Sequence, residues 1–185
     1  MKSIAVYLGS APGCKEVYKS LAREVGRRIA RAGCTLVYGG ADVGTMGALA
    51  DGATEAGGKI VGVFPKGFRG TKEVRESGME VVRHGLSEFI ETDGFAERKQ
   101  VMEDRSDGCI VLPGSFGTLD ELFTYACNRA IDRHAKPIFI FNHEGYYDPL
   151  KQLLAHMQEA GFMKPVMAGA LTFCDTIDEL VAHLK

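Results

Sequence analysis

Short apolar runs alternate with amphipathic segments along the chain, and this alternation predicts the fold. The runs are almost wholly apolar and are bounded by glycine or proline, which is typical of strands buried on both faces of a parallel sheet. They lie at residues 3–8, 35–38, 59–63, 109–112 and 137–141, with a weaker extended stretch at 87–91. Helical periodicity marks residues 16–32, 46–56, 95–105, 119–131 and 147–160, and a last helix is expected at 177–184.

This order predicts an α/β fold over a single domain, residues 1–185. We expect a Rossmann-like, doubly wound, mostly parallel sheet flanked by helices. Only the stretch at 65–85 breaks the rhythm, with glycines and mixed charges. It is interpreted as a surface loop and as a candidate lid over the site.

Composition and charge exclude some classes of partner and binding site. The net charge of −2 gives no basic surface, so a nucleic-acid partner is not expected and any anion site must be local. The five cysteines show no C-x-x-C spacing, which favours free thiols in a reducing compartment over disulfides or zinc. The opening apolar run is too short for a signal peptide or a membrane span. A cytoplasmic protein with no membrane partner is therefore predicted.

Three glycine-rich turns, at 9–13, 39–44 and 114–117, each follow an apolar run. In a parallel sheet, ligands bind outside the carboxyl ends of the strands, so these turns are expected to meet at one ligand. Ser10, Gly39 and Gly40 become binding candidates on this ground. Neither G-x-x-x-x-G-K-[ST] nor a G-x-G-x-x-G after a strand occurs, which argues against triphosphate hydrolysis and ordinary NAD chemistry.

The turn at 113–121 reads Pro-Gly-Ser-Phe-Gly-Thr-Leu-Asp-Glu. Its glycines remove side-chain bulk where a strand passes into a helix, and the N–H groups of residues 115–118 would face a phosphate at the positive end of the helix dipole. Helix capping is the competing interpretation, with Thr118 as N-cap and Glu121 folded back on it. Residues 176–180 repeat the T-x-D-E-L pattern without framing glycines, so capping alone explains that half of the motif.

On the segment 95–105, Arg98, Met102 and Arg105 share one helix face. The simpler interpretation is a solvated helix on which Glu97 and Glu103 offset the cations. The functional one aims the Arg98 guanidinium at a phosphate or a leaving base. The histidines have no spacing typical of metal ligands, so no metal is expected.

These motifs resemble the LONELY GUY (LOG) family, phosphoribohydrolases that release a cytokinin base from its riboside 5′-monophosphate. The family signature P-G-G-x-G-T-x-x-E matches residues 113–121, and M-H-x-R-K matches 95–99. Further matches occur in the right order over nearly the whole chain. Several positions depart from the pattern, and they leave the preferred base open: Ala41, Phe95, Ala96, Ser115, Cys127 and Asn128.

The resemblance implies that Arg98 and Glu121 are the catalytic pair. It also implies a homodimer, a nucleoside 5′-monophosphate as the small-molecule partner, and no cofactor. Glu80 matches a family glutamate that contacts the substrate. Together with the turn residues, the expected substrate- and phosphate-binding set is Ser10, Gly39, Gly40, Glu80, Lys99, Gly114, Ser115, Phe116, Gly117 and Thr118.

The expected substrate is AMP or an N6-modified AMP, and the products are the free base and ribose 5-phosphate. Breaking the ribosyl C1′–N bond builds positive charge on the sugar. The Glu121 carboxylate would stabilise that charge and orient the attacking water, and the helix dipole is expected to keep it ionised. Arg98 would hold the phosphate or ribose.

Two alternatives stand beside this hypothesis. A non-catalytic nucleotide-binding or carrier protein would use the same fold and glycine turns. Lysine decarboxylase is a label often attached to the family, but no lysine lies in a setting typical of pyridoxal phosphate enzymes.

Overall fold

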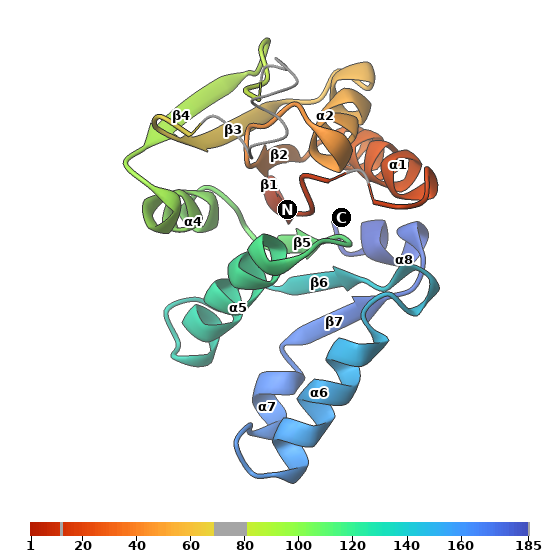
Figure 1. Cartoon of the computed structure of the whole chain (residues 1–185), viewed down its shortest axis with the longest axis vertical. Helices are drawn as coiled ribbons and strands as arrows, with labels where there is room; N and C mark the ends of the chain where they lie inside the picture. The colour runs from red at the N-terminus through yellow and green to blue at the C-terminus, as the bar shows by residue number, and fades with distance from the viewer. Residues whose placement is uncertain (12, 69–80, 185) are drawn as a thin grey trace.

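A parallel β-sheet forms the centre of the molecule (Figure 1). The computed structural model describes residues 1–11, 13–68 and 81–184. In these residues the sheet has seven strands in the order β4-β3-β2-β1-β5-β6-β7, and every neighbouring pair is parallel. The strands are β1 (Ser3–Tyr7), β2 (Thr35–Tyr38), β3 (Ile60–Pro65), β4 (Glu88–Thr92), β5 (Cys109–Val111), β6 (Ile138–Phe141) and β7 (Leu171–Cys174).

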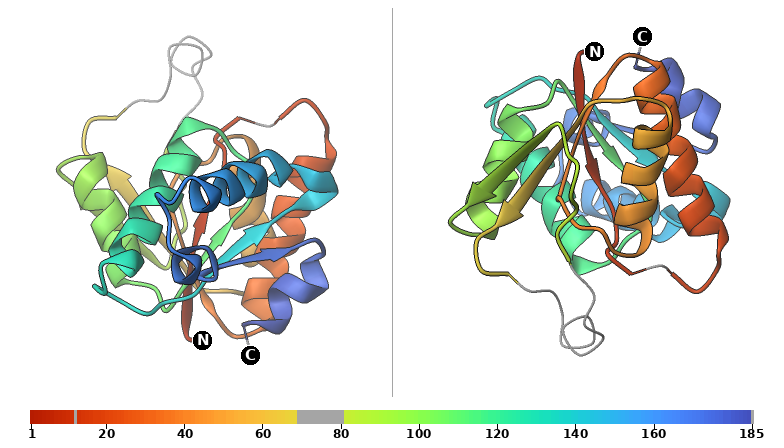
Figure 2. Two further views of the ribbon diagram at one scale, coloured as in Figure 1. Left: turned by 90° about the horizontal axis from the view of Figure 1, so that it is seen from below. Right: turned by 90° about the horizontal axis from the view of Figure 1, so that it is seen from above.

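Helices cover both faces of the sheet, so the doubly wound α/β fold predicted from the sequence is confirmed (Figure 2). One face carries α1 (Val17–Arg31), α2 (Gly44–Glu55) and α8 (Ile177–Ala182). The other carries α4 (Phe95–Asp104), α5 (Phe116–Ala130) and α6 (Asp148–Glu159). A 3₁₀ turn, η1 (His143–Gly145), and a short helix, α7 (Pro165–Ala168), complete the elements.

Alternating side chains of the strands divide the core into two layers. On β1, Ile4 and Val6 pack under α1 and α2, whereas Ala5 and Tyr7 pack under α5. All four are buried, which explains why the run is apolar throughout rather than alternating with polar residues.

The order of the strands determines where a ligand can bind. The chain runs outward from β1 to β4 and then crosses back to β5, which pairs with β1 on its other side. The helices that follow β1 and β5 therefore pack on opposite faces of the sheet. A crevice opens between the carboxyl ends of these two strands. Tyr7 lies opposite Val111 in this pair, so the turns after the two strands start side by side.

Three elements were missed by the sequence pattern: η1, α7 and β7. Strand β7 is an edge strand whose first three residues are only half buried, so it lacks the wholly apolar character of the central strands. Helix α7 is a single turn. The candidate lid at 65–85 lies largely outside the described residues, as does Glu80, and it remains a prediction. Among the described helices, none has the length and apolar character needed to cross a bilayer.

Candidate active site

A cavity of about 770 Å³ opens at the carboxyl edge of the sheet. All three glycine-rich turns contribute to its wall, through Gly9 and Ser10 after β1, Gly39 and Gly44 after β2, and Gly117 after β5. The convergence expected from the sequence is therefore observed. It follows from the parallel topology, which brings the ends of β1, β2 and β5 to one edge.

Most of the residues singled out in the sequence meet at this cavity. Those that line it are Ser10, Gly39, Arg98, Lys99, Ser115, Gly117, Thr118 and Glu121. Three described candidates stand outside its wall: Gly40, Gly114 and Phe116, the last with a side chain that is 90% exposed. Of the departures from the family pattern, Phe95, Ala41 and Ser115 line the cavity. Asn128 instead bonds Glu103 through its side-chain amide at 2.7 Å.

Arg98 and Glu121 form a buried ion pair. The Arg98 Nη1 donates to Glu121 Oε1 at 2.9 Å, and the two side chains are 12% and 10% exposed. The Arg98 Nε donates to the carbonyl oxygen of Val63 at 2.9 Å, which fixes the guanidinium against the end of β3. The interpretation of this helix face as a solvated surface is therefore wrong for Arg98.

Gly39 makes room for this arginine. A Cβ on Gly39 would lie 1.8 Å from Arg98 Nη2 and 2.6 Å from the terminal methyl of Met46. Any side chain at position 39 would therefore displace the guanidinium. The glycine is required by a side chain 59 positions further along the chain (98 − 39), and no local turn pattern could reveal that.

The ionisation of Glu121 differs from the expectation. Burial raises the pKa of this carboxyl to about 7, and the attraction of Arg98 only partly opposes the shift. Helix α5 begins at Phe116, so Glu121 lies beyond its first turn, where the dipole effect has fallen off. Burial and the charge of Arg98 therefore dominate the pKa of this carboxyl, rather than the helix dipole on which the sequence-based expectation relied.

The capping interpretation of this motif is also wrong. Ser115, not Thr118, precedes the helix, and within the described residues no side chain caps it. Thr118 is buried in the first turn beneath Gly114, where a Cβ would lie 2.1 Å from the threonine Oγ1. The Glu121 carboxylate is bonded to Arg98 instead of folding back on the helix start.

The cavity is lined by both polar and apolar side chains. Lys99 Nζ bonds both carboxylate oxygens of Asp120 at 2.8 Å and the Thr124 hydroxyl at 3.0 Å. Phe68 meets Phe95 edge to face with ring centroids 5.2 Å apart, and the ring centroid of Phe64 lies 5.9 Å from that of Phe68. The Arg98 guanidinium lies 5.9 Å from the centre of the Phe95 ring. We call Phe64, Phe68 and Phe95 the aromatic wall.

The sequence analysis did not identify Phe64 or Phe68 as site residues. Phe64 lies in the apolar strand β3, which in the sequence indicates only a core residue. The structure brings the end of β3 to the cavity, so Phe64 also lines the site. Among the described residues, no group of three or more histidine, cysteine, aspartate or glutamate side chains could hold a metal ion.

Comparison with known proteins gives a family and a fold. A family model described as possible lysine decarboxylase matches residues 46–184. A cytokinin riboside 5′-monophosphate phosphoribohydrolase of Rhodococcoides fascians is 36% identical over 100% of this chain and 89% of its own length. The protein of the same name from Mycobacterium tuberculosis is 40% identical over 96% of this chain and 90% of its own. The rice protein of that name, LOG, is 32% identical over 100% of this chain and 73% of its own.

Solved structures with this fold include proteins of another kind. A molybdenum cofactor binding protein from Rippkaea orientalis superposes with a TM-score of 0.70 at 21% identity, covering 100% of this chain and 96% of that one. The molybdenum cofactor carrier protein of Chlamydomonas reinhardtii gives 0.69 at 20% identity, covering 99% and 95%. At such identities the likeness concerns the fold alone.

Proposed function

The chain belongs to the family of cytokinin riboside 5′-monophosphate phosphoribohydrolases, and from this premise we propose that it hydrolyses the N-glycosidic bond of a nucleoside 5′-monophosphate. The substrate is AMP or an N6-modified AMP, and the products are the free base and ribose 5-phosphate. The observation that carries the proposal is the buried Arg98–Glu121 pair at a cavity bordered by three glycine-rich turns.

The 5′-phosphate binds at the start of α5. The first N–H groups of a helix have no partner within the helix, and here the residues concerned are Phe116, Gly117 and Thr118. These donors, together with the positive end of the helix dipole, attract a dianion. The serine hydroxyls of Ser10 and Ser115 border the same space. No metal is needed for this recognition.

Glu121 and Arg98 act on the ribose. The ionised carboxylate stabilises the positive charge that develops at C1′ and orients the attacking water. Its raised pKa makes it a stronger base than an exposed carboxylate. Arg98, held by Val63 and Glu121, orients the ribose phosphate so that C1′ faces the carboxylate.

The base packs against the aromatic wall. Phe64, Phe68 and Phe95, with Met46 and Val81, offer stacking and apolar contact to a purine and to a hydrophobic substituent on its N6 atom. These apolar contacts support N6-modified AMP over a pyrimidine nucleotide.

Base release measured by chromatography tests the proposal. The purified protein is incubated with AMP and, separately, with an N6-prenylated AMP, beside the Arg98→Ala variant. Free base is expected from the wild type, at a rate at least about a hundredfold above that of the variant. Unchanged turnover in the variant contradicts the site assignment. Tight AMP binding without turnover would favour the carrier alternative, which so far has only the shared fold in its favour.

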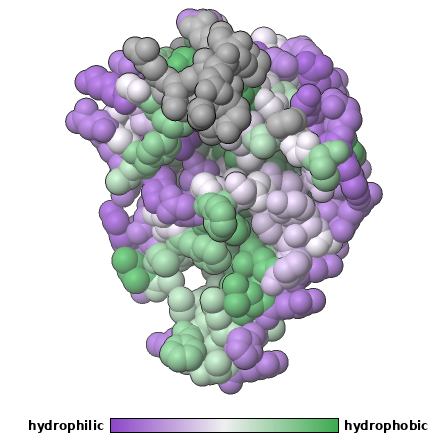
Figure 3. Space-filling model, viewed as in Figure 1, coloured by the Kyte–Doolittle hydropathy of each residue, from purple (hydrophilic) through white to green (hydrophobic). Residues whose placement is uncertain are grey.

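We also propose a homodimer, as the family resemblance implies. Apolar side chains stand exposed along α5 and beside it, including Phe116 at 90% and Ile131 at 67% exposed. Figure 3 shows hydrophobic residues gathered over α5, α6 and α7. A surface of this kind is typical of an interface between subunits. Light scattering after gel filtration is expected to give twice the mass of the chain.

A cytoplasmic location completes the proposal. All five cysteines are free thiols in the structure, and Cys34, Cys109 and Cys174 are buried. Free thiols persist in a reducing compartment. Fractionation of cells that express the protein tests this location.

A further inference from the structure

One side of the cavity depends on a turn that is held from outside. Residues 39–42 follow β2, with Gly39 against the Arg98 guanidinium and Ala41 in the cavity wall. The chain that returns to the described region at Val81 pairs with this turn. Asp42 N–H donates to Val81 O at 2.7 Å, and Arg83 N–H donates to Gly40 O at 2.9 Å.

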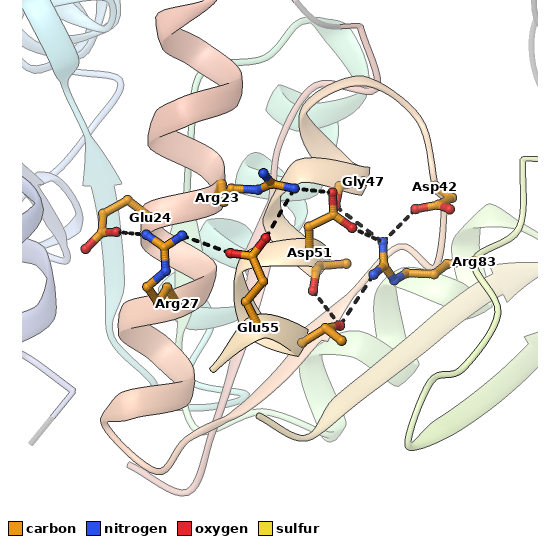
Figure 4. Close-up of polar contacts among 10 residues, drawn as sticks. Arg23, Glu24, Arg27, Asp42, Gly47, Asp51, Glu55 and Arg83 are labelled. Carbon is orange, nitrogen blue, oxygen red and sulfur yellow. Dashed lines mark hydrogen bonds and ion pairs between the residues drawn. The ribbon is translucent and has the colours of Figure 1, made fainter. Parts of the chain in front are cut away.

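The Arg83 side chain adds a second attachment to the same turn. Its Nη1 donates to Asp42 Oδ1 at 2.7 Å and to Asp51 Oδ1 at 2.8 Å, and lies 3.4 Å from Gly47 O (Figure 4). Its Nη2 donates to the Thr54 hydroxyl at 3.4 Å. The Arg83 side chain is only 13% exposed, whereas its partners Asp42 and Asp51 are 44% and 40% exposed, so the arginine is held in place while the carboxylates keep contact with water. One guanidinium thereby ties the turn to α2.

A second arginine shares part of this network without touching the turn. Asp51 offers its other oxygen, Oδ2, to Arg23 of α1 at 2.8 Å, and Arg23 also lies 3.3 Å from Glu55 (Figure 4). Among the described residues, the partners of Arg23 lie on α2 alone. Both arginines therefore bind Asp51, whereas Arg83 alone joins it to Asp42.

We propose that Arg83 is a positioning residue of the active site: by bonding Asp42 and Asp51 it holds the turn 39–42 in the place where Gly39 confines Arg98 and Ala41 borders the substrate. This inference rests on the proposed function of the cavity. Without the guanidinium, two carboxylates lose their shared cation and repel one another, and the turn moves away from α2. The wall then no longer fits either substrate or Arg98.

Arg83→Gln and the control Arg23→Gln separate this role from a general effect on the fold. The first readout is hydrogen exchange of peptides covering residues 39–46 in the ligand-free protein, which does not depend on any activity. Faster exchange is expected in Arg83→Gln and unchanged exchange in Arg23→Gln. The second readout is steady-state kinetics with AMP. The turn borders the substrate and confines Arg98, so in Arg83→Gln KM should rise on the order of tenfold and kcat should fall as well, while both stay unchanged in Arg23→Gln.

Arg83→Lys provides a conservative variant that keeps the charge. Its single ammonium group can bond one carboxylate well but not two. The exchange rate of the turn and KM should therefore be intermediate between those of the wild type and Arg83→Gln. Equal exchange of the turn in the Arg83→Gln and Arg23→Gln proteins would overturn the proposal, as would an unchanged KM in Arg83→Gln. If the wild type releases no base from any monophosphate, the proposed function fails, while the exchange comparison still decides whether Arg83 holds the turn.

Discussion

The same five-residue pattern, T-x-D-E-L, occurs twice in this protein and does two different things. At the start of α8, Thr176 Oγ1 accepts from the Glu179 N–H at 3.2 Å, and the Glu179 carboxylate accepts from the Thr176 N–H at 3.3 Å. That is a complete capping box. In α5 the corresponding pair, Thr118 and Glu121, is buried within the helix, and the glutamate binds Arg98.

The difference comes from where the helix begins. The glycine turn 114–117 lets α5 start at Phe116, before the threonine, whereas α8 starts only after its threonine. An earlier start rotates the glutamate out of the capping position and into the cavity. Two segments that share the T-x-D-E-L pattern therefore differ in role according to the residues that precede them.

The largest effect is expected when each of the two glutamates, Glu121 and Glu179, is replaced. Glu121→Ala should reduce kcat by at least about a hundredfold, because the carboxylate beside C1′ is lost. Glu179→Ala should leave kcat unchanged and lower the midpoint of thermal unfolding by a few degrees. Activity assays and thermal unfolding of both variants make the comparison. A fall in kcat of similar size in the two would remove the functional distinction between the motifs.

A second test displaces Arg98 without changing it. Gly39→Ala places a methyl group against the guanidinium, and a loss of kcat/KM on the order of a hundredfold is expected because the Arg98–Glu121 geometry is disturbed. Gly94→Ala serves as control, since no described atom lies within 4 Å of the added Cβ. Steady-state kinetics with AMP decide the matter, and wild-type activity in Gly39→Ala would show that Arg98 is not confined there.

The pH dependence of the reaction provides a third test. Burial raises the pKa of Glu121 to about 7, so the carboxyl is mostly protonated below that pH and ionised above it. If the ionised form is the active one, kcat/KM should fall about tenfold for each pH unit below the pKa and level off above it. A profile of kcat/KM from pH 5 to 9 measures this. A rise toward low pH would instead assign Glu121 as a proton donor to the leaving base.

The smallest expected effect concerns the threonines. Thr176→Ala removes an observed cap and should lower the free energy of unfolding by about 1 kcal/mol. Its activity should not change. Thr118→Ala removes a buried hydroxyl in the cavity wall, so any activity loss should exceed what its stability change explains. Denaturant unfolding of both variants, with kinetics alongside, separates a capping role from a role in the site.

The sequence predicted the sheet well and the site in part, for physical reasons. Strands that are buried on both faces must be apolar throughout. The apolar runs in the sequence correspond to β1, β2, β3, β5 and β6, whose side chains are largely buried. Strand β7 lies at the edge and is half buried, so its residues carry no comparable mark. The convergence of the glycine turns followed from topology alone.

What the sequence could not provide was contact between distant residues. Arg98 and Glu121 stand 23 positions apart, and nothing in the spacing shows that their side chains meet. The solvated-helix and capping interpretations were reasonable alternatives until that contact was known. The pKa of Glu121 likewise depends on burial by residues from several elements, which no local pattern encodes.

The contact between Gly39 and Arg98 also constrains how such a chain can evolve. A side chain at position 39 is excluded chiefly by the guanidinium, and the terminal methyl of Met46 is the second obstacle. Once Arg98 has been replaced by a small residue, only the flexible end of Met46 opposes alanine at 39, so the two substitutions are tolerated far better in one order than in the other. In a descendant of this protein, a residue larger than glycine at 39 would mark a lineage in which the arginine had already been lost.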